Sequence, residues 1–289
     1  MFNDLITYSC SDCKSTFAAF KDKNIENCIF CNSKNINFVK NENYEKTEII
    51  PFTIDIEEVK KQYRKRVFWN PLIPFKFKGK KRSNKIEKVY YPCYLVEANI
   101  RGITNFLAAD KNKILKNKKR LIELKKYNVK YDINFDYSNV LINSFDKITD
   151  REFAKVCQYN FDSLKKISED SIKNTIIINS NMEEADVETI TGERLMNKSL
   201  SIVKKNITHE LKKVEDNEAN LNFESFKKIL VPIYYINLEY RKKNYHYMVN
   251  GTNNNTYYKF PFGILETILF SIILFGIIFA IIYYIATIL

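Results

Sequence analysis

Six cysteines are the residues of this chain best suited to chemistry, and four of them form two closely spaced pairs. Cys10 and Cys13 are separated by two residues, as are Cys28 and Cys31, with fourteen residues between the pairs. Two residues between cysteines allow both thiolates of a pair to face one ion from a single turn, and two such turns complete a tetrahedral site. The spacing therefore predicts one zinc ion held by these four cysteines, in a zinc ribbon formed by residues 1–40.

Four protein ligands leave no position on the ion for water or a substrate, which is typical of structural rather than catalytic zinc. About 40 residues cannot bury a self-sufficient core, so we expect the metal to supply most of the folding free energy of this module, an apparent ~10–16 kcal/mol. The alternatives are a redox-active dithiol pair, an iron–sulfur cluster, and cysteines that are simply buried. The paired spacing favours zinc over all three.

The turns that carry the cysteines have an unusual composition. Ribbon turns commonly have glycine after the second cysteine of each pair, and this chain has Lys14 and Asn32 there. Asparagine tolerates a left-handed backbone, whereas lysine does so less readily. We therefore expect the two turns to differ in how easily their backbone is formed.

The remaining candidates for chemistry have no partners in the sequence. Cys93 and Cys157 are isolated in apolar segments, which predicts buried core residues. His209 is expected in a polar helix and His246 in a hairpin, and neither lies in a Cys-His or Ser-His pattern. Phosphate-binding loops, dinucleotide fingerprints and zincin motifs are not found. We expect a protein that is not an enzyme and has no small-molecule substrate; the alternative is a catalytic site assembled from residues distant in sequence.

The charge of the chain favours an anionic partner. Its 289 residues are 45% hydrophobic, which is enough for one sizeable core, and carry a formal net charge of +12. Nucleic acid, anionic lipid and acidic protein all fit that charge. The ribbon itself is nearly neutral, with five lysines and four acidic residues in residues 1–40, and the basic residues concentrate in residues 60–130. A nucleic-acid-binding ribbon is therefore the less favoured of two functional hypotheses.

The far C-terminal segment has the composition of a membrane span. Residues 267–289 contain no charged residue, and a helix of this length covers the ~30 Å hydrocarbon core. The alternative is a buried core helix. The cations between Arg241 and Lys259 predict that the N-terminal end of the span faces the cytoplasm. Because the first ten residues lack the features of a signal peptide, we expect a tail-anchored protein of the cell membrane with a reducing, cytoplasmic N-terminal domain.

The elements that must position the cysteines are short. Alternating apolar residues around each cysteine pair predict two small hairpins, with one pair on the turn of each. After them, Asp55 and Glu58 form a capping pattern that predicts a helix. Its apolar face consists of Ile56, Val59, Tyr63 and Val67.

Two segments rich in aromatic and β-branched residues predict strands. Residues 88–100 and 228–240 are similar to each other, with Pro92 and Pro232 at matching places, which is either a faint internal repeat or a chance similarity. A proline in a strand marks an edge or a bulge. Between the two segments, residues 101–137 mix helix and strand signals, and composition does not decide between them.

Three further elements complete the pattern. The capping box Thr149–Glu152 opens a helix that is expected to reach about Ile167, residues 183–214 predict a longer helix, and Asn250–Gly251 predicts the turn of a hairpin. The predicted class is α+β. The expected domains are the zinc ribbon in residues 1–40, an antiparallel sheet with helices in 41–260, and a transmembrane helix in 264–289.

Four short motifs occur in a fixed order and together cover most of the chain. The motifs are Ile50-Pro51-Phe52, Val89-Tyr90-Tyr91-Pro92, Leu230-Val231-Pro232-Ile233-Tyr234 and Met248-Val249-Asn250-Gly251. In that order they resemble a family of bacterial membrane proteins, common in Firmicutes, that carry a transcription-factor-IIB-type zinc ribbon and are sometimes labelled primosomal helicases.

The resemblance implies that the four cysteines are metal ligands, that the segments after Pro92 and Pro232 are sheet strands, and that residues 101–137 are strands as well. It also implies a non-enzymatic membrane-associated protein, since some relatives are linked with flotillin-like or phage-shock-type envelope-stress partners. The chain departs from the family pattern in three ways. It has Lys14 and Asn32 where glycine follows each cysteine pair, it has Tyr94 and Tyr234 where tryptophan is usual, and it ends after one span. We therefore expect an adaptor that binds a membrane-associated protein at the cytosolic face.

Overall fold

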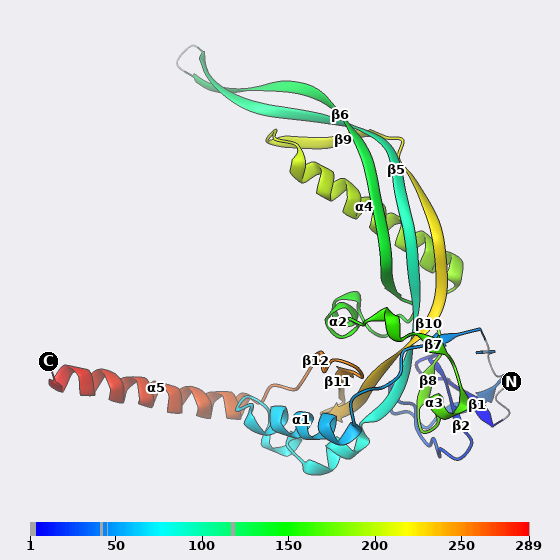
Figure 1. The fold of residues 1–289 in the computed structure, drawn as a ribbon. Coiled ribbons are helices and arrows are strands. Elements are labelled where there is room, and N and C mark those ends of the chain that lie inside the picture. Colours follow the sequence, from blue (N-terminus) through cyan, green and yellow to red (C-terminus); the bar gives the residue numbers. More distant parts are fainter. Residues whose placement is uncertain (1–3, 41–42, 45, 117–118, 289) are drawn as a thin grey trace. The chain divides into compact units, whose positions relative to one another are not determined.

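The structure is a computed structural model that describes residues 4–40, 43–44, 46–116 and 119–288 (Figure 1). It divides into two compact units. Unit 1 comprises Met1–Pro92, Phe145–Asn181 and Ile229–Leu289, and unit 2 comprises Cys93–Ser144 and Met182–Lys228. Met1 and Leu289, the ends of the predicted ribbon and the predicted span, lie outside the described residues. Strands β5 (Glu87–Lys116) and β10 (Asn220–Tyr240) continue from one unit into the other.

A mixed sheet forms the centre of unit 1. Its strand order is β12-β11-β10-β5-β8-β2-β1-β3, and β4 and β7 pair beside β10. Most pairs are antiparallel, as predicted, but β5 pairs in parallel with β8 and β10 pairs in parallel with β4. The strands other than β5 and β10 are β1 (Leu5–Cys10), β2 (Thr16–Phe20), β3 (Ile36–Val39), β4 (Glu48–Ile49), β7 (Lys165–Lys166), β8 (Ile176–Ile178), β11 (Lys243–Asn250) and β12 (Thr256–Tyr258).

Helix α1 (Ile56–Trp69) packs on this sheet through one face. Val59, Tyr63 and Val67 lie four residues apart and are buried, which confirms the predicted apolar face. The ring of Tyr63 meets that of Tyr247 from β11 edge-on, with 5.1 Å between the centroids. Asp55 is the N-cap residue as predicted, with extended backbone angles, but its side chain makes no capping hydrogen bond.

Unit 2 is built on a long pair of antiparallel strands. In this pair β5 lies beside β6 (Lys119–Asn143), in a register that runs from Cys93 opposite Asn143 to Lys116 opposite Lys119. Residues 101–137 therefore form strands in their described part, as the family resemblance implies. On its other edge β5 pairs with β9 (Leu211–Asn217).

Helix α4 (Glu184–Asn206) packs against β6 and supplies the core of unit 2. Every fourth residue of α4 is buried, and the stripe alternates apolar side chains with small hydroxyl side chains: Val187, Thr191, Leu195, Ser199 and Val203. Each hydroxyl is satisfied, because Thr191 donates to the Val187 carbonyl at 2.6 Å and the Ser199 oxygen lies 2.7 Å from the Tyr137 oxygen. The stripe can therefore be buried without leaving unpaired polar atoms.

Two helices end earlier than predicted. The capping box of Thr149 and Glu152 is present, but α2 (Asp150–Val156) ends at Val156 rather than near Ile167. There the chain leaves the helix, and Tyr159 donates to the carbonyl of Pro232 at 2.8 Å. The predicted helix 183–214 ends at Asn206 and is followed by β9, because its last residues gain a ladder with β5.

Helix α5 (Ile264–Ile288) is long and apolar enough to cross a bilayer. Its 25 residues include an 18-residue stretch with a mean hydropathy of 2.8, and none of that stretch is buried within the structure. A core helix would be covered by other elements, so the exposure disfavours that alternative. The remaining short helices are α3 (Glu169–Ile172), η1 (Phe75–Phe77), η2 (Lys80–Lys85) and η3 (Phe161–Ser163).

Candidate metal centre

The first cysteine pair lies on the turn of the hairpin that joins β1 to β2. Cys10 is the last residue of β1, and Cys13 lies in the loop before β2 begins at Thr16. Two backbone hydrogen bonds close the turn: Lys14 donates to the Cys10 carbonyl at 2.9 Å, and Cys10 donates to the Ser15 carbonyl at 3.0 Å. These bonds fold the backbone around one point, so that both sulfurs of the pair face the same way.

The second pair repeats the same backbone pattern. Asn32 donates to the Cys28 carbonyl at 2.9 Å, and Cys28 donates to the Ser33 carbonyl at 2.8 Å. The spacing of donors and acceptors matches that of the first turn residue for residue. The prediction of a second hairpin is wrong, however, because the described residues form a strand only after this turn, in β3. The two turns thus share one hydrogen-bond pattern, but the first lies between two strands and the second is followed by a strand only on its C-terminal side.

The two turns bring all four sulfur atoms together. One ligand atom from each of Cys10, Cys13, Cys28 and Cys31 lies within 4.8 Å of the others. The Cys10 and Cys31 sulfurs are 3.5 Å apart, and the Cys13 and Cys28 sulfurs are 3.6 Å apart. A tetrahedral ion with bonds of ~2.3 Å to sulfur would hold its ligands about 3.8 Å apart. The cluster predicted from the sequence is therefore assembled in a geometry that could hold a metal ion.

The protein environment affects the four thiols unequally. Burial raises the pKa of the Cys28 thiol above its usual range and that of Cys31 to about 11. Burial also acts to raise the pKa of Cys13, but hydrogen bonds with the side chain and backbone of Ser15 outweigh it and bring the pKa to about 7. Thiolates rather than thiols bind metals, so a divalent cation would have to displace protons from the buried members of the set.

A phenylalanine between the cysteines of the second pair fixes this turn to the central sheet. Phe30 is buried, and its ring lies 4.9 Å from that of Phe145 and 5.5 Å from that of Tyr235 on β10. The side chain of Asn237, also on β10, donates a hydrogen bond to the Phe30 carbonyl. This contact was not predicted, because its only signal in the sequence is an apolar Ile-Phe dipeptide between the two cysteines of the second pair.

The two residues that follow the cysteine pairs, where glycine is common, both adopt the left-handed backbone conformation. Lys14 and Asn32 each have φ near +61°. A lysine in this region is strained by about 1–2 kcal/mol, because its Cβ approaches the following carbonyl, whereas asparagine enters it more readily.

Replacing Lys14 with glycine is expected to strengthen the first turn. Relief of the strain exceeds the added chain entropy of glycine, for a net gain of about 0.5–1 kcal/mol. The measurement is the rate at which a chelator removes the metal, which should fall in Lys14→Gly. Asn32→Gly is the matched control and should change this rate less. An equal effect at the two positions would contradict the strain argument.

The other cysteines and the two histidines, which could also take part in chemistry, are not part of the four-cysteine cluster. Cys93 and Cys157 are buried, as predicted. His209 does not lie in a helix but follows α4, with its Nδ1 2.9 Å from a carboxylate oxygen of Asp110. His246 lies on β11 as predicted, and its Nε2 is 3.3 Å from Glu152; burial lowers the pKa of this imidazole.

Three of the four family-like motifs meet at Gly251. Its N–H donates to the Pro232 carbonyl at 2.8 Å, and its own carbonyl accepts hydrogen bonds from Thr53 and Ile54. A Cβ at Gly251 would lie 2.7 Å from the ring of Phe52 and 2.8 Å from Pro232. The glycine is thus required by close packing. The predicted two-residue turn is wrong, because residues 251–255 form a longer loop closed by Asn250 donating to Asn255.

The fourth motif joins the same packed region. The ring of Phe52 lies 5.2 Å from that of Tyr90 and 5.0 Å from that of Tyr234, and the Tyr234 hydroxyl donates to the Ile54 carbonyl at 2.5 Å. These motifs therefore build the core of unit 1. The chemistry that the described residues support best is metal binding by four cysteines. Comparisons with protein families, with curated proteins and with solved structures find no match for this chain.

Proposed function

We propose that this chain is a non-enzymatic adaptor, anchored in the cell membrane by α5, whose ribbon binds a membrane-associated protein at the cytosolic face. A structural zinc ion in the four-cysteine cluster would hold the ribbon in its binding conformation. The support comes from two features: a cluster in which four protein ligands leave no coordination position for a substrate, and an apolar helix with 25 residues.

The observation that carries the adaptor role is the exposed edge of the ribbon. Strand β3 ends the strand order of the sheet, so its outer edge has no partner strand among the described residues. Phe38 on this strand is 74% exposed and Val39 is 42% exposed. An edge strand with exposed apolar side chains favours pairing with a strand from another chain. The ring of Tyr8, 5.3 Å away, supports Phe38 from inside the ribbon.

The charge of the ribbon favours a protein partner over nucleic acid. Residues 1–40 hold five lysines and four acidic residues, so this module offers little net attraction to phosphate. Asp12 strengthens this reasoning, because hydrogen bonds from Ser33 and Asn35 lower the pKa of its carboxyl and keep it charged beside the metal cluster. A nucleic-acid-binding ribbon remains the alternative function.

Site-specific crosslinking tests the proposal. A photoreactive amino acid at position 38 of the full-length protein should yield one discrete adduct with a membrane-associated protein. The adduct should disappear when Cys28→Ser is added, because loss of the metal would release β3. A probe at Ile122, which is 64% exposed and lies on β6, is the control and should not form this adduct. Adduct formation that is insensitive to Cys28→Ser, or salt-sensitive gel shifts with DNA through the ribbon, would overturn the proposal.

A further inference from the structure

Four exposed aromatic side chains lie at the end of α1, at the start of η1 and just before α5. Their exposure is unusual for large apolar side chains, because between 64% and 73% of each residue is accessible to solvent. We call them the aromatic cluster: Phe68, Trp69, Phe75 and Phe262. The first two end α1, the third begins η1, and the fourth lies two residues before α5.

Hydrogen bonds fix the segment between α1 and η1 to the first turn of α5. The N–H of Gly263 donates to the Leu72 carbonyl at 2.9 Å, and the carboxylate of Glu266 accepts from the N–H of Phe75 at 2.9 Å. Because α5 rises only ~1.5 Å per residue, residues 263–266 lie within one turn of the charge-free stretch that begins at Thr267. If α5 spans a bilayer, Phe75 is held at the depth of the lipid headgroups.

The same part of the chain is strongly basic. Residues 59–86 contain eleven lysine and arginine residues and no acidic residue. Among them Arg64, Lys65 and Lys76 are exposed. Aromatic side chains and cations at the end of a span are the side chains that bilayer interfaces favour, and clustered cations bind anionic lipids.

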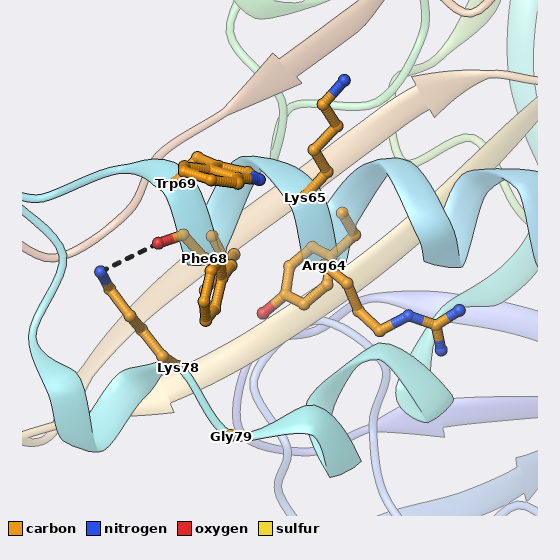
Figure 2. Close-up of a pocket in the computed structure, with 8 residues that line it drawn as sticks. Arg64, Lys65, Phe68, Trp69, Lys78 and Gly79 are labelled. Atoms are coloured by element: carbon orange, nitrogen blue, oxygen red, sulfur yellow. Dashed lines mark hydrogen bonds between the residues drawn. The ribbon is translucent and has the colours of Figure 1, made fainter.

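A pocket of about 250 Å³ opens beside this cluster. Figure 2 shows Phe68 and Trp69 at the end of α1, with Arg64 and Lys65 one turn earlier and Lys78 and Gly79 on the facing segment. Lys78 donates to the Phe68 carbonyl at 3.2 Å, which joins the two walls. The residues that line the pocket are thus apolar and aromatic side chains together with three cationic ones, a composition that suits an amphipathic ligand.

We infer that the aromatic cluster and its basic surroundings form a second membrane-binding element, which docks in the headgroup region of an anionic bilayer beside α5. This inference rests on the proposed membrane anchor and is independent of the partner of β3. Docking fixes the orientation of α1 relative to the bilayer surface. The aromatic rings enter the interface, while Arg64, Lys65 and Lys76 contact lipid phosphates.

Trp69 is the only tryptophan of the chain, so its fluorescence reports on this surface alone. The full-length protein is reconstituted in phosphatidylcholine vesicles with and without 30% phosphatidylglycerol (roughly the anionic range that basic segments sense). We expect blue-shifted Trp69 emission that is quenched by lipids brominated near the headgroup, and more strongly in the anionic vesicles. Lys65→Glu with Lys76→Glu should reduce that quenching at least twofold. The matched control is Lys165→Glu with Lys166→Glu, two exposed lysines of β7, which should leave it unchanged.

Three outcomes would overturn the inference. Trp69 that is quenched by aqueous acrylamide but not by headgroup-brominated lipids in the anionic vesicles, while carbonate fails to extract the chain, refutes the interfacial element but leaves the anchor in place. Extraction by carbonate refutes the anchor and the inference together. Shielding of Trp69 in native membranes but not in pure lipid vesicles assigns the surface to a protein partner instead. Crosslinking from position 38 reports on the proposed function separately from all three.

Discussion

Replacing Cys28 with serine is expected to weaken metal binding roughly 100-fold, so that a chelator strips the ion from the variant and the ribbon unfolds. Cys28 is 2% exposed and supplies one of four clustered sulfurs. Serine offers a poor ligand, and the loss of one ligand in four forfeits roughly a quarter of the ~10–16 kcal/mol that a structural zinc site contributes, or at least ~100-fold in affinity. The measurement is metal content by mass spectrometry, together with limited proteolysis of residues 4–40.

Cys157→Ala is the matched control for this experiment. Cys157 is also a buried thiol, but it lies outside the metal cluster, so the variant should keep its metal and lose only the ~1–2 kcal/mol of a small cavity. Protein purified without chelator should carry one equivalent of zinc. Equal retention of zinc by Cys28→Ser and the parent protein against the same chelator, or an iron chromophore in the parent protein, would disprove the structural zinc site.

The second large effect is expected at Gly102. This residue has φ of +141°, and an added Cβ would lie 2.6 Å from the Cα of Ala219 and 2.7 Å from the Glu218 carbonyl oxygen. Both obstacles are backbone atoms of the turn that joins β9 to β10, so they cannot rotate away. Gly102→Ala should therefore destabilise unit 2 by about 3 kcal/mol or more, combining strained angles with a steric clash.

Urea unfolding followed by circular dichroism in detergent, with hydrogen exchange of β5 and β9 amides, measures this loss. The control is Gly79→Ala, because Gly79 has φ of −63° and its added Cβ meets no atom within 4 Å. That variant should change stability by no more than ~0.5 kcal/mol. Equal midpoints for the two variants would show that the turn can move away from β5.

Local rules accounted for the elements whose signals are short in sequence. The cysteine spacing anticipated a cluster that the structure assembles, and the apolar spacing of Val59, Tyr63 and Val67 anticipated the buried face of α1. The capping box of Thr149 and Glu152 correctly marked the start of α2. In each case the interacting residues lie within a few turns of one another, or within the short segment from Cys10 to Cys31.

Long-range pairing explains what local rules missed. Residues 211–217 have the composition of a helix end, yet they form β9 because β5 offers an open edge. Asn250–Gly251 has the sequence of a two-residue turn, but the backbone of Gly251 is already hydrogen-bonded to Pro232 and to Thr53. The partners of β9 on β5 lie more than 100 residues earlier in the sequence, and Thr53, which is hydrogen-bonded to Gly251, lies farther still. A prediction from neighbouring residues cannot include such partners.

The strand order of unit 1 also determines how long the first strands must wait during synthesis before the sheet can be completed. Strands β1 and β2 lie at one end of the sheet, while β11 and β12, at the other end, are made some 240 residues later and directly before α5. At about 5–20 residues per second, the first strands wait on the order of 10–50 s for the sheet to close. Capture of one metal ion by residues 10–31 needs none of those later strands. A metal ion bound there would thus protect residues 10–31 through the interval in which the neighbouring strand edges are most open to misassembly.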